Sequence, residues 1–460
     1  MQKKSNRIQT AASAAVCKSV RAALRRSGRG GTAIPGLAAM KVSRNILGTV
    51  SEGMEIVVVT GTNGKTTTCN MLEPALTQAG CDCLLNKSGA NMLHGIAADL
   101  ICNTDWAGRP KSHYAVLECD EAALKLLVPY FQPKVIVVTN LFSDQVDRYG
   151  GVQNTLKEIR AGVEKSPDSV LVLNAEDPLS ASLALNVPNR TVWYGFEKSA
   201  GVMGNIDTQD AGVCPVCGSP YTYDYHVYAH LGGFRCEKCG YSRKSADVAV
   251  TAITDMDETG STFTARIDGG EKEIRLALPA VYNVYNGAAA IAAAMAMGIP
   301  AEAAAESLST VHSSFGRLET FDLGKNRLQM ILVKNPAGAN QAFSYVTGFD
   351  QDFAAVLCLN NRTGDGHDIS WIHDTDYEKL CQDEHVKKIY VCGDQAQSLY
   401  DRLKEAGAPE DILEISTDYK ALLPELESLD LPVFALPNYT AMMELRGELV
   451  RATGQQEFWE

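Results

Sequence analysis

Short apolar runs, rich in β-branched residues, recur along the chain in two series. Each run is followed by a polar or glycine turn and then by a helical pattern, which is typical of βαβ units and a mostly parallel sheet. The second series begins after Gly316 and predicts a smaller, Rossmann-like α/β domain. The predicted strands are Ile56–Thr60, Tyr114–Glu118, Val135–Asn140 and Val170–Asn174 in the first series, and Leu328–Val333, Ala354–Leu359, Lys388–Cys392 and Val433–Leu436 in the second.

Two stretches between these series have a different pattern. Asn286–Met297 is rich in alanine and predicts a closely packed core helix, whereas Gly201–Asp247 fits neither series and is interpreted as an insertion. The chain is also too long for one ordinary core. We therefore expect a basic N-terminal segment over residues 1–50, a central domain over 51–313 that holds the insertion at about 201–247, and a C-terminal domain over 314–460.

The composition is that of a soluble globular protein, with 45% hydrophobic and 21% charged residues among 460. No window approaches the roughly 18 to 20 consecutive apolar residues that a membrane-spanning helix needs. An integral membrane protein is therefore not expected. Nine cysteines are scattered singly, which indicates reduced thiols and a cytoplasmic protein; they are Cys17, Cys69, Cys81, Cys83, Cys102, Cys119, Cys358, Cys381 and Cys392.

The charge is distributed unevenly. Residues 1–44 contain ten Lys or Arg and no acid, so a net charge of −13 for the whole chain leaves −23 on the remainder. An acidic body argues against a general nucleic-acid binder. The basic start is compatible with a transit peptide, with an amphipathic helix at an anionic membrane surface, or with a first helix that has a solvated basic face. Peripheral contact with a membrane surface is thus the most that we expect.

A phosphate-binding loop is predicted where the valines of the first run end. Gly61 and Gly64 allow backbone amides to turn towards phosphate oxygens at a helix N-terminus. Lys65 would reach the β- and γ-phosphates of a nucleotide, and Thr66 would place its hydroxyl on Mg²⁺. The full pattern is not present, because Val59 stands at its first glycine position. The predicted loop residues are Gly61, Thr62, Asn63, Gly64, Lys65, Thr66 and Thr67.

A magnesium site also needs a carboxylate from outside the loop. Glu118 closes a predicted strand, where its side chain would project from the carboxyl edge of the sheet towards a ligand. Taken alone, such a residue is more often a solvated acid at the end of a strand. Beside a phosphate loop we predict that Glu118 is a metal ligand and catalytic residue, with Asp120 and Glu121 as weaker candidates.

Four further cysteines form two Cys-x-x-Cys pairs separated by 18 residues. Each pair is followed by a glycine, Gly218 or Gly240, that permits a tight turn. Four thiolates suit a closed, tetrahedral, structural Zn²⁺ site with no open position for catalysis. The alternative is a zinc ribbon that binds nucleic acid, but few cations lie nearby, so a stabilising insertion is favoured. The predicted ligands are Cys214, Cys217, Cys236 and Cys239.

Several segments together resemble the Mur ligase family: the phosphate loop, residues 118–121, the run Thr139–Tyr149, residues 283–286 and Phe315–Glu319. Within that family, the four-cysteine insertion and the segments Lys334–Gln341 and Asp365–Ile372 resemble MurT-type members. The resemblance implies an α/β fold with a Mur-ligase-like central P-loop domain, a parallel sheet, a zinc-ribbon insertion with four cysteine ligands and a smaller Rossmann-like C-terminal domain.

The resemblance also implies a function. MurT-type proteins are the synthetase half of lipid II isoglutaminyl synthase, which amidates the α-carboxylate of D-glutamate in the peptidoglycan stem peptide. ATP converts the carboxylate to an acyl phosphate, and a separate glutaminase, GatD, supplies ammonia to form D-isoglutamine. Heterodimer formation with a GatD-type subunit, a lipid II substrate and the cofactors ATP, Mg²⁺ and Zn²⁺ are therefore expected.

Further site residues are implied only by this resemblance. Asn286, and less strongly Asn283, would lie near the adenine, and Arg317 would clamp a phosphate when the C-terminal domain closes. Without the family, these residues are two helix N-cap residues and a surface cation. The carbamoylated lysine of many Mur ligases is not evident; Lys198 is a weak candidate, so the number of magnesium ions stays open.

One implied role reaches another chain. The family supplies an aspartate that orients the histidine of the partner's Cys-His pair, because an acceptor must fix the imidazole tautomer and stabilise its cation. Asp368 and Asp365 are both candidates, with Asp368 slightly preferred. Two alternative functions also stay open: an amino-acid-adding ligase without a glutaminase, and a non-enzymatic, nucleotide-gated binding module.

Overall fold

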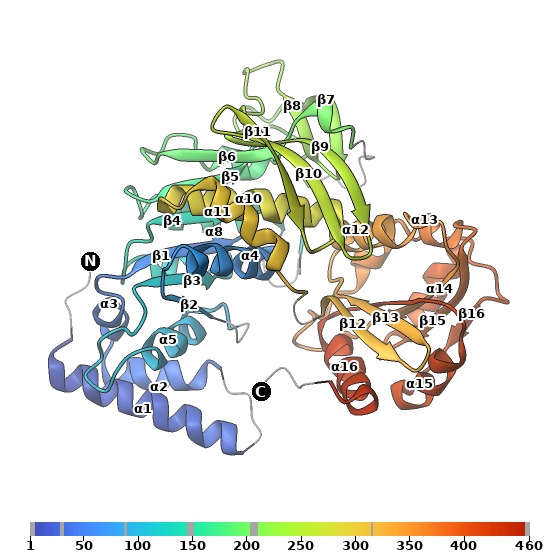
Figure 1. The fold of residues 1–460 in the computed structure, drawn as a ribbon, viewed down its shortest axis with the longest axis horizontal. Helices are drawn as coiled ribbons and strands as arrows, with labels where there is room; N and C mark the ends of the chain where they lie inside the picture. Colours follow the sequence, from blue (N-terminus) through green and yellow to red (C-terminus); the bar gives the residue numbers. More distant parts are fainter. Residues whose placement is uncertain are drawn as a thin grey trace.

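The computed structural model describes residues 5–27, 32–86, 90–144, 151–202, 210–313 and 316–455. It contains two large sheets and one hairpin (Figure 1). The nine-stranded sheet has the order β11-β10-β9-β6-β5-β4-β1-β3-β2, and the six-stranded sheet has the order β12-β13-β17-β14-β15-β16. The strands are β1 Glu55–Thr60, β2 Cys83–Leu85, β3 Tyr114–Glu118, β4 Val135–Val138, β5 Val170–Asn174, β6 Thr191–Phe196, β7 Thr222–Tyr228, β8 Leu231–Arg235, β9 Val248–Asp257, β10 Gly260–Ile267, β11 Gly270–Leu276, β12 Arg317–Leu323, β13 Asn326–Ile331, β14 Phe353–Cys358, β15 Val386–Cys392, β16 Leu413–Ile415 and β17 Val433–Pro437.

Helices cover both faces of the six-stranded sheet and of the parallel part of the nine-stranded sheet, as expected for parallel strands joined by helical crossovers. In the first unit, α4, α10 and α11 share a core with one face, while α1, α3, α5, α6 and α8 share a core with the other. The helices are α1 Arg7–Arg26, α2 Ile34–Val42, α3 Ile46–Val50, α4 Lys65–Gln78, α5 Leu93–Cys102, α6 Leu124–Leu127, α8 Val152–Val163, α9 Pro178–Ser182, α10 Val281–Met297, α11 Ala301–Ser307, α12 Pro336–Val346, α13 Tyr377–Cys381, α14 Ala396–Glu405, α15 Tyr419–Ser428 and α16 Tyr439–Thr453.

The predicted α/β class is confirmed. All eight predicted strands are present as β1, β3, β4, β5, β13, β14, β15 and β17, each within two residues of its predicted ends. The alanine-rich helix is α10, which begins five residues earlier than predicted and is buried along nearly its whole length. Burial on all sides explains its composition, because small side chains let a helix pack closely between neighbours.

Some elements were not predicted. Strands β9, β10 and β11 form an antiparallel meander that extends the parallel sheet at β6. Their alternating burial over β10 is the pattern of a sheet with only one face covered, not of a βαβ unit. The insertion holds the β7–β8 hairpin. The predicted domain boundary at 313/314 touches residues 314–315, outside the described residues, and stays a prediction.

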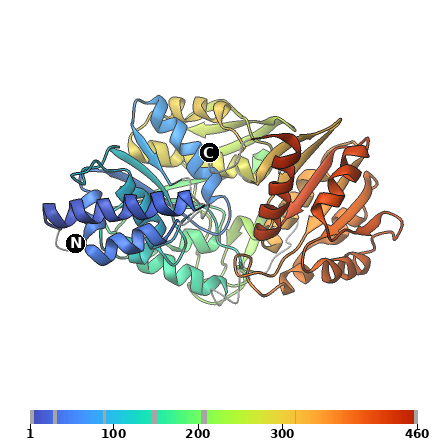
Figure 2. The ribbon, with the colours of Figure 1, turned by 90° about the horizontal axis from the view of Figure 1, so that it is seen from below.

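The basic N-terminal segment forms α1, α2 and α3, and α1 and α2 lie side by side at one end of the molecule (Figures 1 and 2). α1 is held on α5 by an ion pair between Arg21 and Asp99 at 2.9 Å and by Lys18, whose ammonium donates to the carbonyl of Thr104. Among the described residues, none of the helices combines the length and the apolar character that crossing a bilayer requires.

Candidate functional site

The phosphate loop lies between β1 and α4, as the sequence predicts. Gly61 and Gly64 adopt φ values of +118° and +85°, a region that side chains disfavour. Space is limiting too: a Cβ on Gly64 would lie 2.2 Å from Oδ1 of Asn286, and one on Gly61 would lie 2.4 Å from Oγ1 of Thr139. Gly64 is also the N-cap of α4, which has no side-chain cap and no acid in its first turn. The loop thus leaves a helix N-terminus open to an anion.

Lys65 is buried among acceptors. Its ammonium donates to the carbonyls of Gly61 and Thr62 and forms an ion pair with Glu121 at 2.9 Å. Burial acts to lower the pKa of Lys65, but the carboxylates of Glu121 and Glu118 more than offset it and hold the pKa above its ordinary value. Lys65 therefore carries a charge in the centre of the loop, where a phosphate could replace the loop carbonyls as acceptor.

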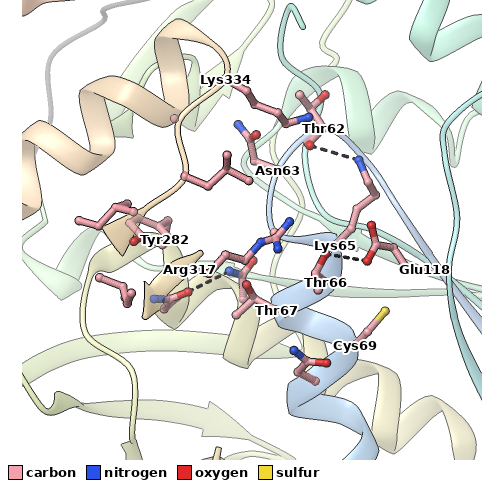
Figure 3. Close-up of a pocket in the computed structure, with 18 of the residues that line it drawn as sticks. Thr62, Asn63, Lys65, Thr66, Thr67, Cys69, Glu118, Tyr282, Arg317 and Lys334 are labelled. Carbon is pink, nitrogen blue, oxygen red and sulfur yellow. Dashed lines mark hydrogen bonds between the residues drawn. The ribbon is translucent and has the colours of Figure 1, made fainter. Parts of the chain in front are cut away.

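Thr66 and Glu118 meet at the mouth of the loop. The Thr66 hydroxyl donates to Oε2 of Glu118 at 2.6 Å (Figure 3). Asn86 fixes the backbone of Glu118 from both sides, because it accepts from the Glu118 amide and donates to its carbonyl, while Asn91 donates to Oε1 at 3.2 Å. This group of oxygen donors fits a hard divalent cation such as Mg²⁺. Asn86 and Asn91 were not predicted from the sequence.

The two asparagines of α10 face the loop. Asn286 contacts Gly64 and donates to Oδ1 of Asn283, and Asn283 donates to the carbonyl of Pro279. Both are buried and line the cavity. The alternative interpretation as N-cap residues is wrong, since the N-cap of α10 is Ala280 and lacks a side-chain cap.

Arg317 projects into the site from the first residue of β12. Leu318 has a φ of +58°, and the pairing of β12 with β13 shifts register there. Such a bulge redirects the flanking side chain, and Figure 3 shows Arg317 directed towards the first turn of α4. Burial lowers the pKa of Arg317, although Glu118 acts in the opposite direction. Arg317 is therefore not a surface cation.

Glu319, two residues further along β12, anchors this strand. Its carboxylate accepts from the Gly316 amide at 2.8 Å and pairs with Arg446 of α16 at 2.9 Å. The motif residues Gly316, Arg317 and Glu319 thus fix the direction in which β12 leaves the central unit. Phe315 of the same motif lies outside the described residues.

The C-terminal unit forms the opposite wall of a cavity of about 800 Å³. Asn335 exchanges two hydrogen bonds with Asn63 of the loop, and Lys334 pairs with Asp144. Burial acts to raise the pKa of Glu121, but the charges of Lys65 and, to a lesser extent, Lys334 hold it below its ordinary value. Asp144 belongs to the predicted run Thr139–Tyr149, whose residues 145–149 lie outside the described residues. The cavity is lined from both units, including Thr62, Asn63, Gly64, Lys65, Thr66, Thr67, Glu118, Asp120, Asn283, Asn286, Arg317, Lys334 and Asp365.

The two candidate aspartates differ in their surroundings. Asp365 accepts hydrogen bonds from the amide and hydroxyl of Thr440, so its carboxylate closes a turn against α16. Asp368 is exposed, and the amide of Ser370 donates to it at 2.8 Å, which lowers its pKa. Asp368 does not line the cavity. It is a charged acceptor at the surface, whereas Asp365 is already engaged.

The four predicted ligands of the insertion are brought together. Their sulfur atoms all lie within 4.8 Å of one another, with Cys214–Cys239 at 3.6 Å and Cys217–Cys236 at 3.5 Å. Gly218 and Gly240 have φ values of +71° and +76°, so both predicted tight turns are present. These four cysteines fit a metal ion with tetrahedral coordination by thiolates.

A buried carboxylate that was not predicted links this insertion to the phosphate loop. Glu176 accepts from Tyr225 of β7 at 2.8 Å and from Tyr285 of α10 at 2.6 Å, and also from the Phe196 amide. Burial raises its pKa to about 7. Tyr285 precedes Asn286, which contacts Gly64. The β7–β8 hairpin, α10 and the phosphate loop therefore form one connected network.

Lys198 is not brought to the cavity. It lies in the exposed 3₁₀ turn Lys198–Ala200 and is absent from the described residues that line the cavity. Glu121, in contrast, lines the cavity as the partner of Lys65.

Comparisons with known proteins show the relatives of this chain. The family models "Mur ligase middle domain" and "MurT ligase C-terminal" match residues 59–215 and 332–442. Subunit MurT of the lipid II isoglutaminyl synthase (glutamine-hydrolyzing) of Streptococcus pneumoniae is 34% identical over 92% of this chain and 93% of that protein. The subunit of the same name from Staphylococcus aureus is 31% identical over 95% and 97%. MurF from Acinetobacter baumannii shares the fold, with a TM-score of 0.66 and 17% identity over 91% of this chain and 81% of that chain.

Proposed function

Because the chain belongs to the MurT family of Mur ligases, we propose that it is the ATP-dependent synthetase subunit of a lipid II isoglutaminyl synthase in peptidoglycan synthesis. Its substrate is the D-glutamate α-carboxylate of lipid II, and its partner is a GatD-type glutaminase. The reaction takes place at the inner face of the plasma membrane. The contact between Thr66 and Glu118, beside Lys65 and facing the C-terminal wall, is the observation that carries the proposal.

The reaction has two steps. A carboxylate oxygen of the substrate attacks the γ-phosphorus of ATP, and ADP leaves, which gives an acyl phosphate. Ammonia then attacks the acyl carbon; phosphate leaves with its bonding electrons, and the nitrogen loses a proton. The product is the amide. Activation is needed because a carboxylate is a poor electrophile.

The residues of the cavity suit these steps. The open amides of α4 bind phosphate oxygens, and Lys65 neutralises charge on the transferred phosphoryl group. Thr66 and Glu118 would hold Mg²⁺, which would supply positive charge to offset charge on the phosphates. Arg317, at the start of β12 where the chain enters the C-terminal unit, contacts a phosphate, and Asn283 and Asn286 lie beside the nucleotide. Contacts of Asn335 and Lys334 with the central unit support a closed arrangement that excludes water.

We assign the partner's acceptor to Asp368. The exposed, ionised carboxylate of Asp368 is available to another chain, whereas the carboxylate of Asp365 accepts hydrogen bonds from Thr440. Asp368 would fix the tautomer of the glutaminase histidine and stabilise its cation.

Replacing Lys65 tests the synthetase function. With the glutaminase, ATP, Mg²⁺ and glutamine, Lys65→Ala is expected to lower lipid II amidation by about 100- to 1000-fold, because a cation is lost where charge moves. Lys198→Ala, at an exposed site outside the cavity, is the matched control and is expected to keep full activity. Product is measured by mass spectrometry. Unchanged amidation by Lys65→Ala contradicts the proposal, and ATP turnover driven by a free amino acid without the glutaminase indicates an amino-acid-adding ligase instead.

Replacing Asp368 separates the two half-reactions. Asp368→Asn is expected to reduce glutamine hydrolysis by up to about 10⁴-fold, because the imidazole loses its charged acceptor. Amidation driven by added ammonium salt is expected to persist, since the ATP site is intact. Asp374→Asn, another exposed acid nearby, serves as the control. If Asp365→Asn alone abolishes glutamine hydrolysis in a folded protein, the assignment passes to Asp365.

We further propose that the four cysteines bind one structural Zn²⁺. Removing it with a strong chelator is expected to lower the melting temperature by several degrees, because metal binding contributes directly to folding. Metal analysis should find one zinc per chain in the wild type and less in Cys217→Ser. Cys81→Ser, at a single thiol outside the cluster, should keep its zinc. A full zinc complement in Cys217→Ser would argue against this site.

A further inference from the structure

The N-terminal hairpin of helices combines exposed apolar side chains with positive charge. Ile8 of α1 is 82% exposed, Ile34 of α2 is 54% exposed, and Trp106, in the loop beside α1, is 71% exposed. Leu37 and Val42 of α2 are exposed as well. These five residues are nearly half of the large hydrophobic residues that the described chain exposes, so they are concentrated at one end of the molecule.

The cations of this region divide into two groups. Arg21 and Lys18 bind α1 to the body, through Asp99 and the carbonyl of Thr104. The others are exposed; no acid lies between residues 5 and 44, and Asp105 in the adjoining loop lies near Arg109 and Lys18. The exposed cations of the two helices and the adjoining loop are Arg7, Arg25, Arg26, Lys41, Arg44, Arg109 and Lys111.

The outer face of the hairpin is free for a ligand. Figure 2 shows α1 at the surface of the molecule, with no element over it. The ammonium of Lys18 lies 5.0 Å from the centre of the Trp106 ring, so the indole stands at the edge of the basic helix. Exposed aliphatic side chains and cations on two adjacent helices, with an aromatic ring in the loop beside them, are the components that bind a lipid interface.

We propose that this surface, formed by the outer faces of α1 and α2 with Trp106, docks the protein on an anionic phospholipid bilayer. The charge of residues 1–44 is complementary to anionic headgroups, whereas the remainder of the chain, at −23, is repelled by them. The exposed Ile and Trp side chains add apolar contact at the headgroup boundary. The choice of a membrane as the occupant rests on the proposed function, because the substrate of that function is linked to a lipid.

The surface lies close to the reaction site. α2 packs on the first turn of α5, so tightly that a Cβ on Gly36 would lie 1.9 Å from the carbonyl oxygen of His94. Three residues before His94, Asn91 lines the cavity and holds Glu118. Docking through α2 therefore brings the bilayer next to the wall of the cavity that carries the metal-binding carboxylate.

Vesicle binding tests this inference with the purified full chain. We expect sedimentation with vesicles of phosphatidylglycerol and phosphatidylcholine, little with pure phosphatidylcholine, and weakening as salt rises. Each lost cation near an anionic surface weakens binding by about fivefold (about 1 kcal/mol), so the double variant Arg25→Gln/Arg26→Gln should bind about 25-fold more weakly. Ile34→Ser and Trp106→Ala should weaken binding without changing its salt dependence.

Lys420→Gln/Arg451→Gln removes two exposed cations of the C-terminal unit and should bind like the wild type. Circular dichroism of each variant establishes that it is folded. Failure to bind anionic vesicles, equal weakening by the two double variants, or salt-sensitive binding to DNA in place of vesicles overturns the inference.

Amidation of detergent-dispersed lipid II is measured in parallel. Activity without vesicle binding refutes only the docking surface, whereas no activity in detergent refutes the proposed function whatever the vesicles show.

Discussion

The hydrogen bond between the Thr66 hydroxyl and Glu118 joins the two elements on which the site depends, the first turn of α4 and the end of β3. β1 and β3 are parallel neighbours, with Val59 opposite Glu118, so both end at the same edge of the sheet. The Thr66 and Glu118 oxygens, which we propose as metal ligands, and the open amides of α4 therefore face one cavity. Gly64 makes this possible, because any larger residue would collide with Asn286 of α10.

Residues adjacent in sequence to a recognisable turn could be predicted. The Gly61–Thr67 loop and Glu118 follow directly from strands and turn chemistry, and the four cysteines follow from their spacing. Asn86, Asn91 and Asn335 could not be predicted, because each acts through a contact with a distant segment: Asn335 meets Asn63 across 272 positions. Asn86 and Asn91 reach Glu118 through the packing of the central unit, and Asn335 reaches Asn63 through the packing of the two units. No local sequence pattern indicates either kind of contact. The antiparallel β9–β11 meander was missed because its strands have one covered face and lack helical crossovers.

Glu176 shows how the insertion is tied to the chemistry. Its carboxylate accepts hydrogen bonds from Tyr225 of the β7–β8 hairpin, which the four cysteines flank, and from Tyr285 of α10, the helix that supplies Asn283 and Asn286. A buried acid with several donors stabilises one arrangement of these elements over others. The insertion is thus connected through Glu176 and α10 to the phosphate loop. The start of β12, where the chain enters the C-terminal unit, is fixed in a similar way. Glu319 pairs with Arg446, and the bulge at Leu318 directs Arg317 into the cavity.

Calorimetric titration with a non-hydrolysable ATP analogue, with and without Mg²⁺, tests the central claim that Thr66 and Glu118 form a metal-dependent nucleotide site. In the wild type, Mg²⁺ should strengthen binding. In Glu118→Gln, affinity in the presence of Mg²⁺ should fall by at least about tenfold, while affinity without Mg²⁺ should be no weaker than in the wild type. An equal strengthening by Mg²⁺ in both proteins would contradict the account.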